Sequence, residues 1–298
     1  MESILLTGGN GFLGAIIAKN LSENKVIKLG LSNKSDIIAD ISLGIPVLPS
    51  VDYVVHCAGK AHVVPKTDEE RAQFYKINVD GTRNLLAGLR NSKSIPKYFI
   101  FISTVAVYGL DQGLLINEEN ELLAKDEYGL SKIQAESLVL EWCKTNNVIC
   151  SILRLPLIAG ETPPGNLGAM IKGIEKGYYF NVDSGKARKS IVLAEDVGKI
   201  IHKVAVKGGI YNLTDGYHPS FSELASAISK QLRKREPLSL PLWLVKIIAK
   251  IGDLLGDKAP INSIKLKKII SDLTFDDKKA RRSLNWNPKI VLNEFKIK

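Results

Sequence analysis

The sequence predicts an α/β protein with a doubly wound parallel sheet and a smaller, mainly helical C-terminal lobe. Over the first 160 residues, short apolar runs that end in small residues alternate with segments whose apolar residues recur at helical spacing. Strands that alternate with helices in this way form a parallel sheet covered by helices on both faces. Beyond residue 160 most of the chain has helical periodicity.

The expected elements follow one another in a regular order. Strands are expected at 3–9, 25–31, 51–59, 97–109 and 148–160, with helices at 12–24, 74–92 and 126–146. Right-handed crossovers between these strands build a Rossmann-like layer. We therefore expect a Rossmann domain at 1–160 and a second lobe at 161–298. A further strand at 209–216 suggests that residues about 186–214 return to the first domain.

Composition and charge exclude several classes of protein. Hydrophobic residues make up 45% of the chain and charged residues 24%, an ordinary globular balance. The cysteines Cys57, Cys143 and Cys150 show no C-x-x-C spacing, so we expect no disulfide framework and no metal site, and a reducing cytoplasm fits. The net charge of +10 indicates a basic surface or an anionic ligand. No basic arm is present and aromatic residues are only 7%, so no nucleic-acid partner is expected.

The sequence contains no candidate membrane span. No apolar run reaches the ~20 residues that a span needs. The nearest is 240–256, which contains Lys246, Lys250 and Asp253 and has apolar residues at helical spacing. We expect this amphipathic helix to pack in the core or as a lid; the alternative is a helix that lies on a membrane surface.

The stretch "LLTGGNGFLG" places a glycine-rich turn between the first strand and the first helix. Its glycines fit two registers, G-x-G-x-x-G from Gly9 or G-x-x-G-x-x-G from Gly8. A helix N-terminus with exposed N–H groups attracts a phosphate, and glycines let the backbone approach it closely. The turn therefore predicts a site for the pyrophosphate of a dinucleotide.

The end of the second strand bears on the choice of cofactor. An NAD-binding unit usually has an acidic residue there, which binds the adenosine ribose. This chain has Gly30 at that place, followed by Ser32, Asn33 and Lys34, and no acidic residue before Asp36. A hydroxyl, an amide and an ammonium suit a 2′-phosphate. The expected cofactor is therefore NAD or NADP, and this loop favours NADP.

A tyrosine and a lysine stand four residues apart in "EYGLSK". Tyr128 and Lys132 therefore lie on one face of the helix that begins there. A tyrosine has a pKa of ~10, and a nearby ammonium lowers that pKa by stabilising the phenolate. Such a pair can act as acid or base on a hydroxyl or carbonyl. The preceding strand ends in Ser103 and Thr104, whose hydroxyls can hold the reacting oxygen beside the tyrosine.

Taken together, these motifs resemble those of a known family. TGGxGFxG, "HCAG", "INVDGT", "STVAVYG" and Y-x-x-x-K occur in the order found in extended short-chain dehydrogenase/reductases. More narrowly, the chain resembles NAD(P)-dependent sugar-nucleotide epimerases, dehydratases and ketoreductases. The resemblance covers nearly the whole chain and favours the register Gly8, Gly11, Gly14.

The resemblance implies a role for each matching residue. Tyr128 is the general acid/base, Lys132 tunes it, and Thr104 is the catalytic hydroxyl. The implied cofactor-binding residues are Gly8, Asn10, Gly11, Phe12, Leu13, Gly14, Ser32, Asn33, Lys34, Asp40, Ile41, Cys57, Ala58, Gly59, Asn78, Ser103, Tyr128 and Lys132. The implied substrate-binding residues are Thr104, Val105, Asn166, Leu167, Arg188 and Lys189. Either Arg188 or Lys189 can contact the diphosphate.

Two reactions remain open, and a third is disfavoured. The family's 4,6-dehydratases carry Asp-Glu after the catalytic threonine, where this chain has Val105 and Ala106. The first expectation is a 4-ketoreductase of a UDP-4-keto-6-deoxy-N-acetylhexosamine type of substrate in surface polysaccharide biosynthesis. The C-terminal half resembles reductases that make N-acetylquinovosamine-type sugars. The alternative is a 4-epimerase of UDP-glucose or UDP-N-acetylglucosamine type.

A non-catalytic dinucleotide-binding redox sensor is a third class, which the retained Tyr128, Lys132 and Thr104 argue against. The resemblance also implies a homodimer. In it, helices near 76–91 and 128–145 of two copies pair into a four-helix bundle.

Overall fold

The computed structural model describes residues 2–61, 63–255 and 261–298. Its centre is a seven-stranded parallel sheet in the order β11-β7-β5-β4-β1-β2-β3. The strands are β1 (Ser3–Thr7), β2 (Lys25–Gly30), β3 (Ile37–Ile38), β4 (Tyr53–His56), β5 (Tyr98–Thr104), β7 (Ile149–Leu155) and β11 (Gly209–Asn212). The predicted α/β class and Rossmann-like sheet are thus confirmed.

Strand order identifies where a ligand should bind. From β1 the chain builds outward to β2 and β3, then returns to the other side of β1 and continues with β4 and β5. In open α/β sheets, ligands bind outside the carboxyl ends of the strands at such a reversal. The reversal in this sheet lies between β1 and β4.

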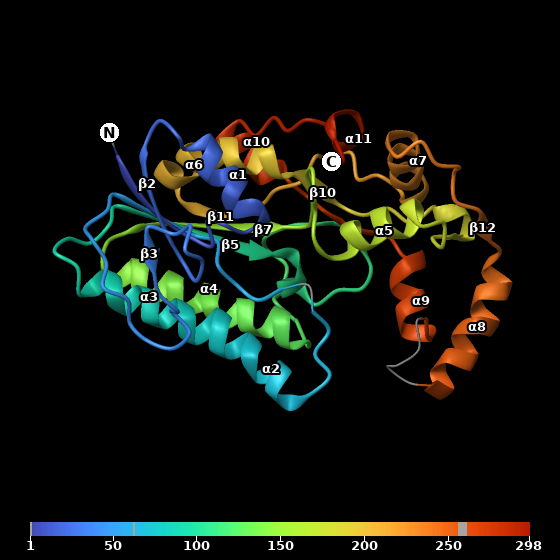
Figure 1. The fold of residues 1–298 in the computed structure, drawn as a ribbon, viewed down its shortest axis with the longest axis horizontal. Helices are drawn as coiled ribbons and strands as arrows, with labels where there is room; N and C mark the ends of the chain where they lie inside the picture. The colour runs from blue at the N-terminus through green and yellow to red at the C-terminus, as the bar shows by residue number, and fades with distance from the viewer. Residues whose placement is uncertain (1, 62, 256–260) are drawn as a thin grey trace.

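Helices cover both faces of the sheet (Figure 1). On one face lie α1 (Phe12–Asn20), α6 (Ala194–Lys207) and α10 (Lys278–Leu284). On the other face lie α2 (Asp68–Tyr75), the π-helical turn η1 (Lys76–Asp80), α3 (Gly81–Arg90) and α4 (Glu127–Thr145). The continuous apolar sequence of β1 follows from this double cover. Ile4 and Leu6 join the hydrophobic cluster with α1 and α6, whereas Leu5 joins the cluster with α3 and α4.

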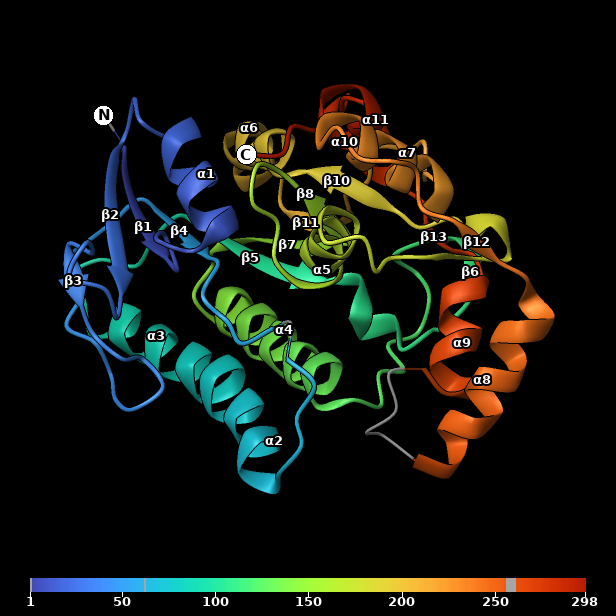
Figure 2. The same cartoon turned by 45° about the vertical axis from the view of Figure 1, so that its right-hand side comes forward.

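We call the remaining elements the second lobe (Figure 2). Its helices are α5 (Gly165–Glu175), α7 (Phe221–Gln231), α8 (Leu242–Leu255), α9 (Ser263–Ile270) and α11 (Val291–Glu294). Its short elements are β6 (Gly113–Ile116), β8 (Leu157–Ala159), β9 (Asn181–Val182), β10 (Ile191–Leu193), β12 (Ser239–Leu240), β13 (Leu273–Phe275) and the 3-10 turns η2 (Val105–Tyr108) and η3 (Asp183–Gly185). Three of these elements, η2, β6 and β8, come from before the predicted boundary at residue 160.

The C-terminal region contributes to both parts of the molecule. Ala280, Leu284 and Trp286 belong to the hydrophobic cluster of the sheet layer, and β11 completes the sheet. The helix predicted at 240–256 begins at Leu242, and its expected last residue, Gly256, lies outside the described residues. In the described part of the chain, no helix combines the length and the apolar character needed to cross a membrane.

Candidate active site

The glycine turn after β1 brings backbone atoms unusually close together. Gly8 has φ of +68°, and a Cβ there would lie 2.8 Å from the backbone nitrogen of Ala58. The Gly11 N–H donates to the Gly8 carbonyl at 2.9 Å, which closes the turn. A Cβ on Gly14 would lie only 2.1 Å from that same carbonyl oxygen. The structure thus has close approaches at Gly8 and Gly14, two positions of the register implied by the resemblance.

The turn leads into a helix N-terminus that can bind an anion. Gly11 is the N-cap of α1 and has no side chain to cap the first turn. The N–H groups of the first helical residues therefore have no partner within the helix. The Leu13 side chain is buried in the hydrophobic cluster, so only its backbone is available to a ligand. The Asn10 amide donates to the Ser35 hydroxyl at 2.8 Å and ties the turn to the loop after β2.

Gly14→Ala should disrupt this turn. The added methyl group would overlap the Gly8 carbonyl, so the turn must shift away from the geometry that presents its N–H groups. We expect at least tenfold weaker binding of NADPH or NADH, measured by fluorescence titration, from a displacement worth about 1.4 kcal/mol or more. Gly44→Ala is the matched control, because nothing lies within 4 Å of the added methyl group. Equal affinities for the two variants would contradict this role of the turn.

The loop after β2 offers polar groups and no unengaged carboxylate next to the strand. Ser32 accepts the Lys34 N–H at 3.1 Å, which forms a tight turn with Asn33 and Lys34 exposed. Asp36 accepts the backbone N–H of Lys28 at 2.8 Å, so its carboxylate is engaged by β2 itself. The turn at Asp40 and Ile41 docks on α3, where the Ile41 carbonyl accepts from Asn84.

A buried histidine supports the segment after β4. Thr82 donates its hydroxyl to the Asn78 carbonyl at 2.6 Å, so its oxygen must accept from Nε2–H of His56. Nδ1 of His56 then accepts from Thr7, whose oxygen in turn accepts the Ala58 N–H. The histidine is therefore the neutral Nε2–H tautomer. Burial lowers its pKa to about 3.

This neutral histidine predicts an acid-sensitive stability. Between pH 6.5 and pH 3 the unfolded chain protonates His56 and the folded chain does not, so folding loses about 1.4 kcal/mol per pH unit below 6.5. We expect the free energy of unfolding by urea to fall about 2 kcal/mol more between pH 7 and pH 5 in the natural protein than in His56→Gln. The same pH dependence in both proteins would refute this assignment.

Asn78 connects the loop after β4 to the first turn of α4. It lies in η1, accepts the Lys60 N–H at 2.7 Å and donates to the Lys60 carbonyl at 3.1 Å. It also donates to the Ser131 hydroxyl at 2.9 Å, which in turn donates to the Tyr128 carbonyl. These hydrogen bonds therefore fix the position of the segment Cys57–Gly59 relative to the first turn of α4. A π-helical turn is frequent at functional sites.

The predicted catalytic hydroxyls meet at the carboxyl end of β5. Thr104 ends β5, and its Oγ1 accepts the Ala106 N–H at 3.2 Å. Asp126 caps α4 by accepting the Gly129 N–H at 2.9 Å, which places Tyr128 in the first turn. Burial raises the pKa of Tyr128 to about 12, and a hydrogen bond with Thr104 opposes that rise. The phenol is thus protonated at neutral pH and can donate a proton.

Lys132 is oriented differently from the sequence-based expectation. Its ammonium donates to the Ile102 carbonyl at 2.7 Å and lies 3.9 Å from the centre of the Phe101 ring. Burial lowers its pKa to about 8, while the carboxylate of Glu136 raises it. Since a buried ammonium needs an acceptor, it bonds to the strand. The ammonium therefore does not lower the pKa of Tyr128 in this structure.

Ser103 and Thr104 face different surroundings, since successive strand residues point to opposite faces. The Ser103 hydroxyl is buried and donates to Glu136. Glu136 also accepts from Arg154 Nε at 3.2 Å and Nη2 at 2.8 Å. Ser103 is thus available to a ligand through its backbone only. Sequence reasoning missed this Glu136–Arg154 pair, although Glu136 lies four residues after Lys132 on the same helix face.

The second lobe holds the remaining predicted residues. Val105 begins η2, Asn166 is exposed in the first turn of α5, and Leu167 is buried in the lobe's hydrophobic cluster. Lys189 donates to the carbonyls of Lys268 and Ser271, both at 2.9 Å. Arg188 donates to the His218 carbonyl at 3.1 Å and lies over the Tyr217 ring. The Lys189 ammonium is therefore bonded to the C-terminal end of α9. Arg188 is exposed, so its guanidinium is more accessible to a ligand than the Lys189 ammonium.

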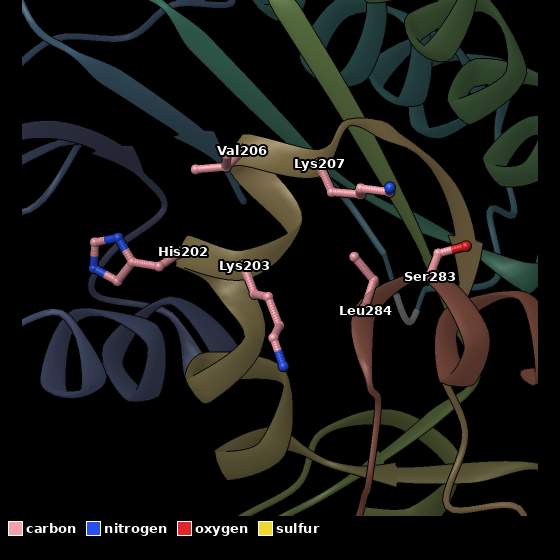
Figure 3. A pocket seen from close by; sticks show the side chains of 6 residues that line it. All are labelled: His202, Lys203, Val206, Lys207, Ser283 and Leu284. Atoms are coloured by element: carbon pink, nitrogen blue, oxygen red, sulfur yellow. The ribbon is translucent and has the colours of Figure 1, made fainter.

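Two surface depressions among the described residues lie away from Thr104 and Tyr128. One is lined by His202, Lys203, Val206, Lys207, Ser283 and Leu284, between α6 and α10 (Figure 3). The other is lined by residues that include Tyr217 and, from α10, Arg281. Neither contains Thr104 or Tyr128. The candidate site is instead defined by the carboxyl ends of the adjacent strands β1, β4 and β5.

Comparison with known sequences decides the family. The sequence model of the NAD dependent epimerase/dehydratase family matches residues 4–214. The chain belongs to this family. The match runs from the glycine turn through Tyr128 and Lys132 to β11.

Members of this family with similar sequences act on different sugars. The UDP-glucose 4-epimerase of Vibrio cholerae is 27% identical over 98% of this chain and 93% of its own. The N-acetyl-alpha-D-glucosaminyl-diphospho-ditrans,octacis-undecaprenol 4-epimerase of Escherichia coli O157:H7 is 29% identical over 95% of this chain and 89% of its own. The fold is similar to that of UDP-glucose 4-epimerase from Thermotoga maritima, solved with UDP-glucose, with a TM-score of 0.75 and 21% identity over 98% and 96% of the two chains.

Proposed function

We propose that this protein is an NAD(P)-dependent oxidoreductase acting at C4 of a nucleotide-activated sugar. Its favoured reaction is reduction of a UDP-4-keto-6-deoxy-N-acetylhexosamine type of substrate, in surface polysaccharide biosynthesis. One observation carries the proposal. Tyr128 lies near Thr104, whose hydroxyl opposes the burial-driven rise of the phenol's pKa, and the phenol holds its proton at neutral pH. A ketone accepting hydride needs this kind of donor at its oxygen.

The residues present fit a dinucleotide. The close approaches at Gly8 and Gly14 leave no room for a side chain, and the first turn of α1 lacks a side-chain cap. Its N–H groups would hold the pyrophosphate, with Cys57–Gly59 alongside. The bound cofactor supplies the hydride that reaches C4.

The side chains of this protein supply the proton and the orientation. Thr104 would hold the substrate's O4 by a hydrogen bond while the Tyr128 hydroxyl gives O4 its proton. The C4 carbonyl, having gained the hydride at carbon, thereby becomes a secondary alcohol. The Tyr128 phenolate that remains then takes a proton back from solvent. Arg188 is the candidate contact for the nucleotide diphosphate, since the Lys189 ammonium is already bonded to two carbonyls.

The loop after β2 supports NADP as the cofactor. Asp36, the first acidic residue after the strand, is bonded to the Lys28 N–H. Ser32, Asn33 and Lys34 offer donors suited to a 2′-phosphate. A reductase consumes a reduced cofactor such as NADPH in each turnover. An epimerase regenerates its NAD in each turnover and therefore gains by keeping it bound.

A 4-epimerase is the second candidate, because both curated relatives described above are named as 4-epimerases. In that reaction Tyr128 would first act as a base on the 4-hydroxyl. A positive nicotinamide beside the phenol would have to bring its pKa down from about 12. A homodimer through α3 and α4, and a cytoplasmic location, remain predictions.

The reductase and the epimerase can be told apart by the nucleotide that they hold. The purified protein is denatured, and the released nucleotide is identified by mass spectrometry. A site without tightly held nucleotide, together with NADPH oxidation in the presence of a UDP-4-keto-6-deoxy-N-acetylhexosamine, would support the reductase. Near-stoichiometric NAD and interconversion of UDP-sugar epimers would support the epimerase instead. Cofactor binding without either reaction would point to a redox sensor and overturn both.

A further inference from the structure

Helix α8 carries a row of apolar side chains on its solvent-exposed side. Trp243, Ile247, Ile251 and Leu254 are 64%, 50%, 58% and 87% exposed. Their spacings of four, four and three residues place them on one face of the helix. Single exposed apolar residues are ordinary on a protein surface, but a contiguous row of large ones marks an interaction site.

This row is distinct from the face that anchors α8 to the protein. Val245 and Ala249 are buried in a small hydrophobic cluster with Leu266 of α9. Packing therefore accounts for one apolar face of α8 and leaves the other unexplained. Figures 1 and 2 place α8 at the edge of the second lobe farthest from β2 and β3. The exposed row thus lies at the periphery of the molecule.

Lysines border the exposed row. Lys246 and Lys250 are exposed and lie one turn apart on α8, beside the face that carries Trp243 and Ile247. Helix α8 itself carries two lysines and one aspartate, a net charge of +1. That aspartate, Asp253, accepts the N–H and the hydroxyl of Ser263 at 2.8 and 2.6 Å. The two lysines therefore give the border of the apolar row a small excess of positive charge.

We propose that the exposed face of α8 binds the surface of an anionic lipid bilayer. A tryptophan beside aliphatic residues, with lysines along the border, is the pattern of a helix that lies in the interfacial plane. The indole and the aliphatic side chains enter the headgroup boundary, while the ammonium groups meet anionic headgroups. The contact is peripheral, since no helix of the described residues can cross a bilayer.

A second copy of this chain fits the same face less well. An isologous contact would place the lysine border of one copy against that of the other. Juxtaposed like charges cost several kcal/mol at an interface, whereas anionic headgroups neutralise them. The bilayer is therefore the occupant that satisfies both the apolar row and its charged border. This proposal does not depend on which sugar the enzyme uses.

Trp243 provides a direct optical test, because Trp142 and Trp286 are buried. The full-length protein is mixed with vesicles of phosphatidylcholine, with or without phosphatidylglycerol, then sedimented while tryptophan emission is recorded. We expect co-sedimentation with the anionic vesicles, a blue shift of the emission, and much weaker binding in high salt. Binding to neither kind of vesicle would overturn the proposal.

Two triple variants localise the contact. Replacing Ile247, Ile251 and Leu254 by serine keeps the Trp243 reporter and should weaken vesicle binding at least tenfold. The matched control is the triple variant Leu43→Ser, Val47→Ser, Leu114→Ser. These apolar residues lie elsewhere on the surface and are 70%, 92% and 69% exposed. Circular dichroism checks that both variants are folded.

Two outcomes would overturn the assignment to a bilayer on α8. Equal binding by the two variants would place the lipid contact elsewhere. A blue shift that grows with protein concentration in the absence of vesicles, with a doubled mass in sedimentation, would show that the face binds a second copy instead.

Discussion

Tyr128→Phe is expected to lower kcat by about 10²–10⁴-fold, the range that a positioned general acid contributes. The variant keeps the ring and loses only the hydroxyl that lies near Thr104. Since the glycine turn and Cys57–Gly59 are untouched, we expect the Kd for NADPH or NADH to change by less than about twofold, within about 0.4 kcal/mol. Steady-state kinetics and a fluorescence titration measure the two quantities.

Tyr178→Phe is the matched control for this substitution. Tyr178 is 58% exposed and lies in the second lobe, so removal of its hydroxyl should leave both kcat and Kd unchanged. If Tyr128→Phe keeps full turnover, the proton comes from another group and the mechanism fails. If it loses cofactor binding as well, the hydroxyl serves binding and the assignment as a general acid loses its support.

The sheet was predictable from sequence because each central strand is a short apolar run between turn residues. β1 shows why, since Ile4 and Leu5 face different hydrophobic clusters and both must be apolar. The beginning of α2 was missed because only Phe74 of that helix is buried, and apolar periodicity is absent. A capping signal was present, since Thr67 is followed by Glu70, whose N–H it accepts.

The short strands of the second lobe could not be predicted in the same way. β6 and β13 pair across more than a hundred and fifty residues, and the pairing begins with Gly113 opposite Leu273. Strands of two to four residues have no measurable alternation, and only the folded lobe brings them together. The sequence therefore predicts the Rossmann layer far better than it predicts the lobe attached to it.

The candidate site likewise has features that local sequence predicts and features that depend on residues far away in the chain. Motif order singled out Gly8, Gly14, Thr104 and Tyr128, because the predicted chemistry requires these residue types. The direction of the Lys132 side chain depends on the Ile102 carbonyl, thirty residues away in sequence. The preference for Arg188 over Lys189 in the proposed function likewise depends on where α9 ends, which the sequence does not indicate.

Glu136→Ala is expected to cost about 3–5 kcal/mol of stability, the usual effect of leaving one partner of a buried ion pair alone. Glu136 and Arg154 are 2% and 3% exposed, and their side chains meet at 2.8 Å. Without the carboxylate, the guanidinium keeps the Tyr108 hydroxyl, at 3.1 Å, as its side-chain acceptor. Urea unfolding measures the loss. Glu294→Ala, which breaks the exposed pair with Lys289, should cost less than about 1 kcal/mol.

The double variant Glu136→Leu, Arg154→Leu tests what the pair does beyond stability. Removing both charges should restore most of the stability, because no buried charge is left unpaired. The Glu136 carboxylate also raises the pKa of Lys132, which burial lowers to about 8. Its removal moves that pKa down towards neutral, so Lys132 should lose its proton at a lower pH in the double variant than in the natural protein, as followed by NMR of the lysine side chain. Recovery of stability with an unchanged Lys132 titration would mean that Glu136 only neutralises Arg154; a titration shifted to lower pH would mean that the buried pair also keeps Lys132 charged.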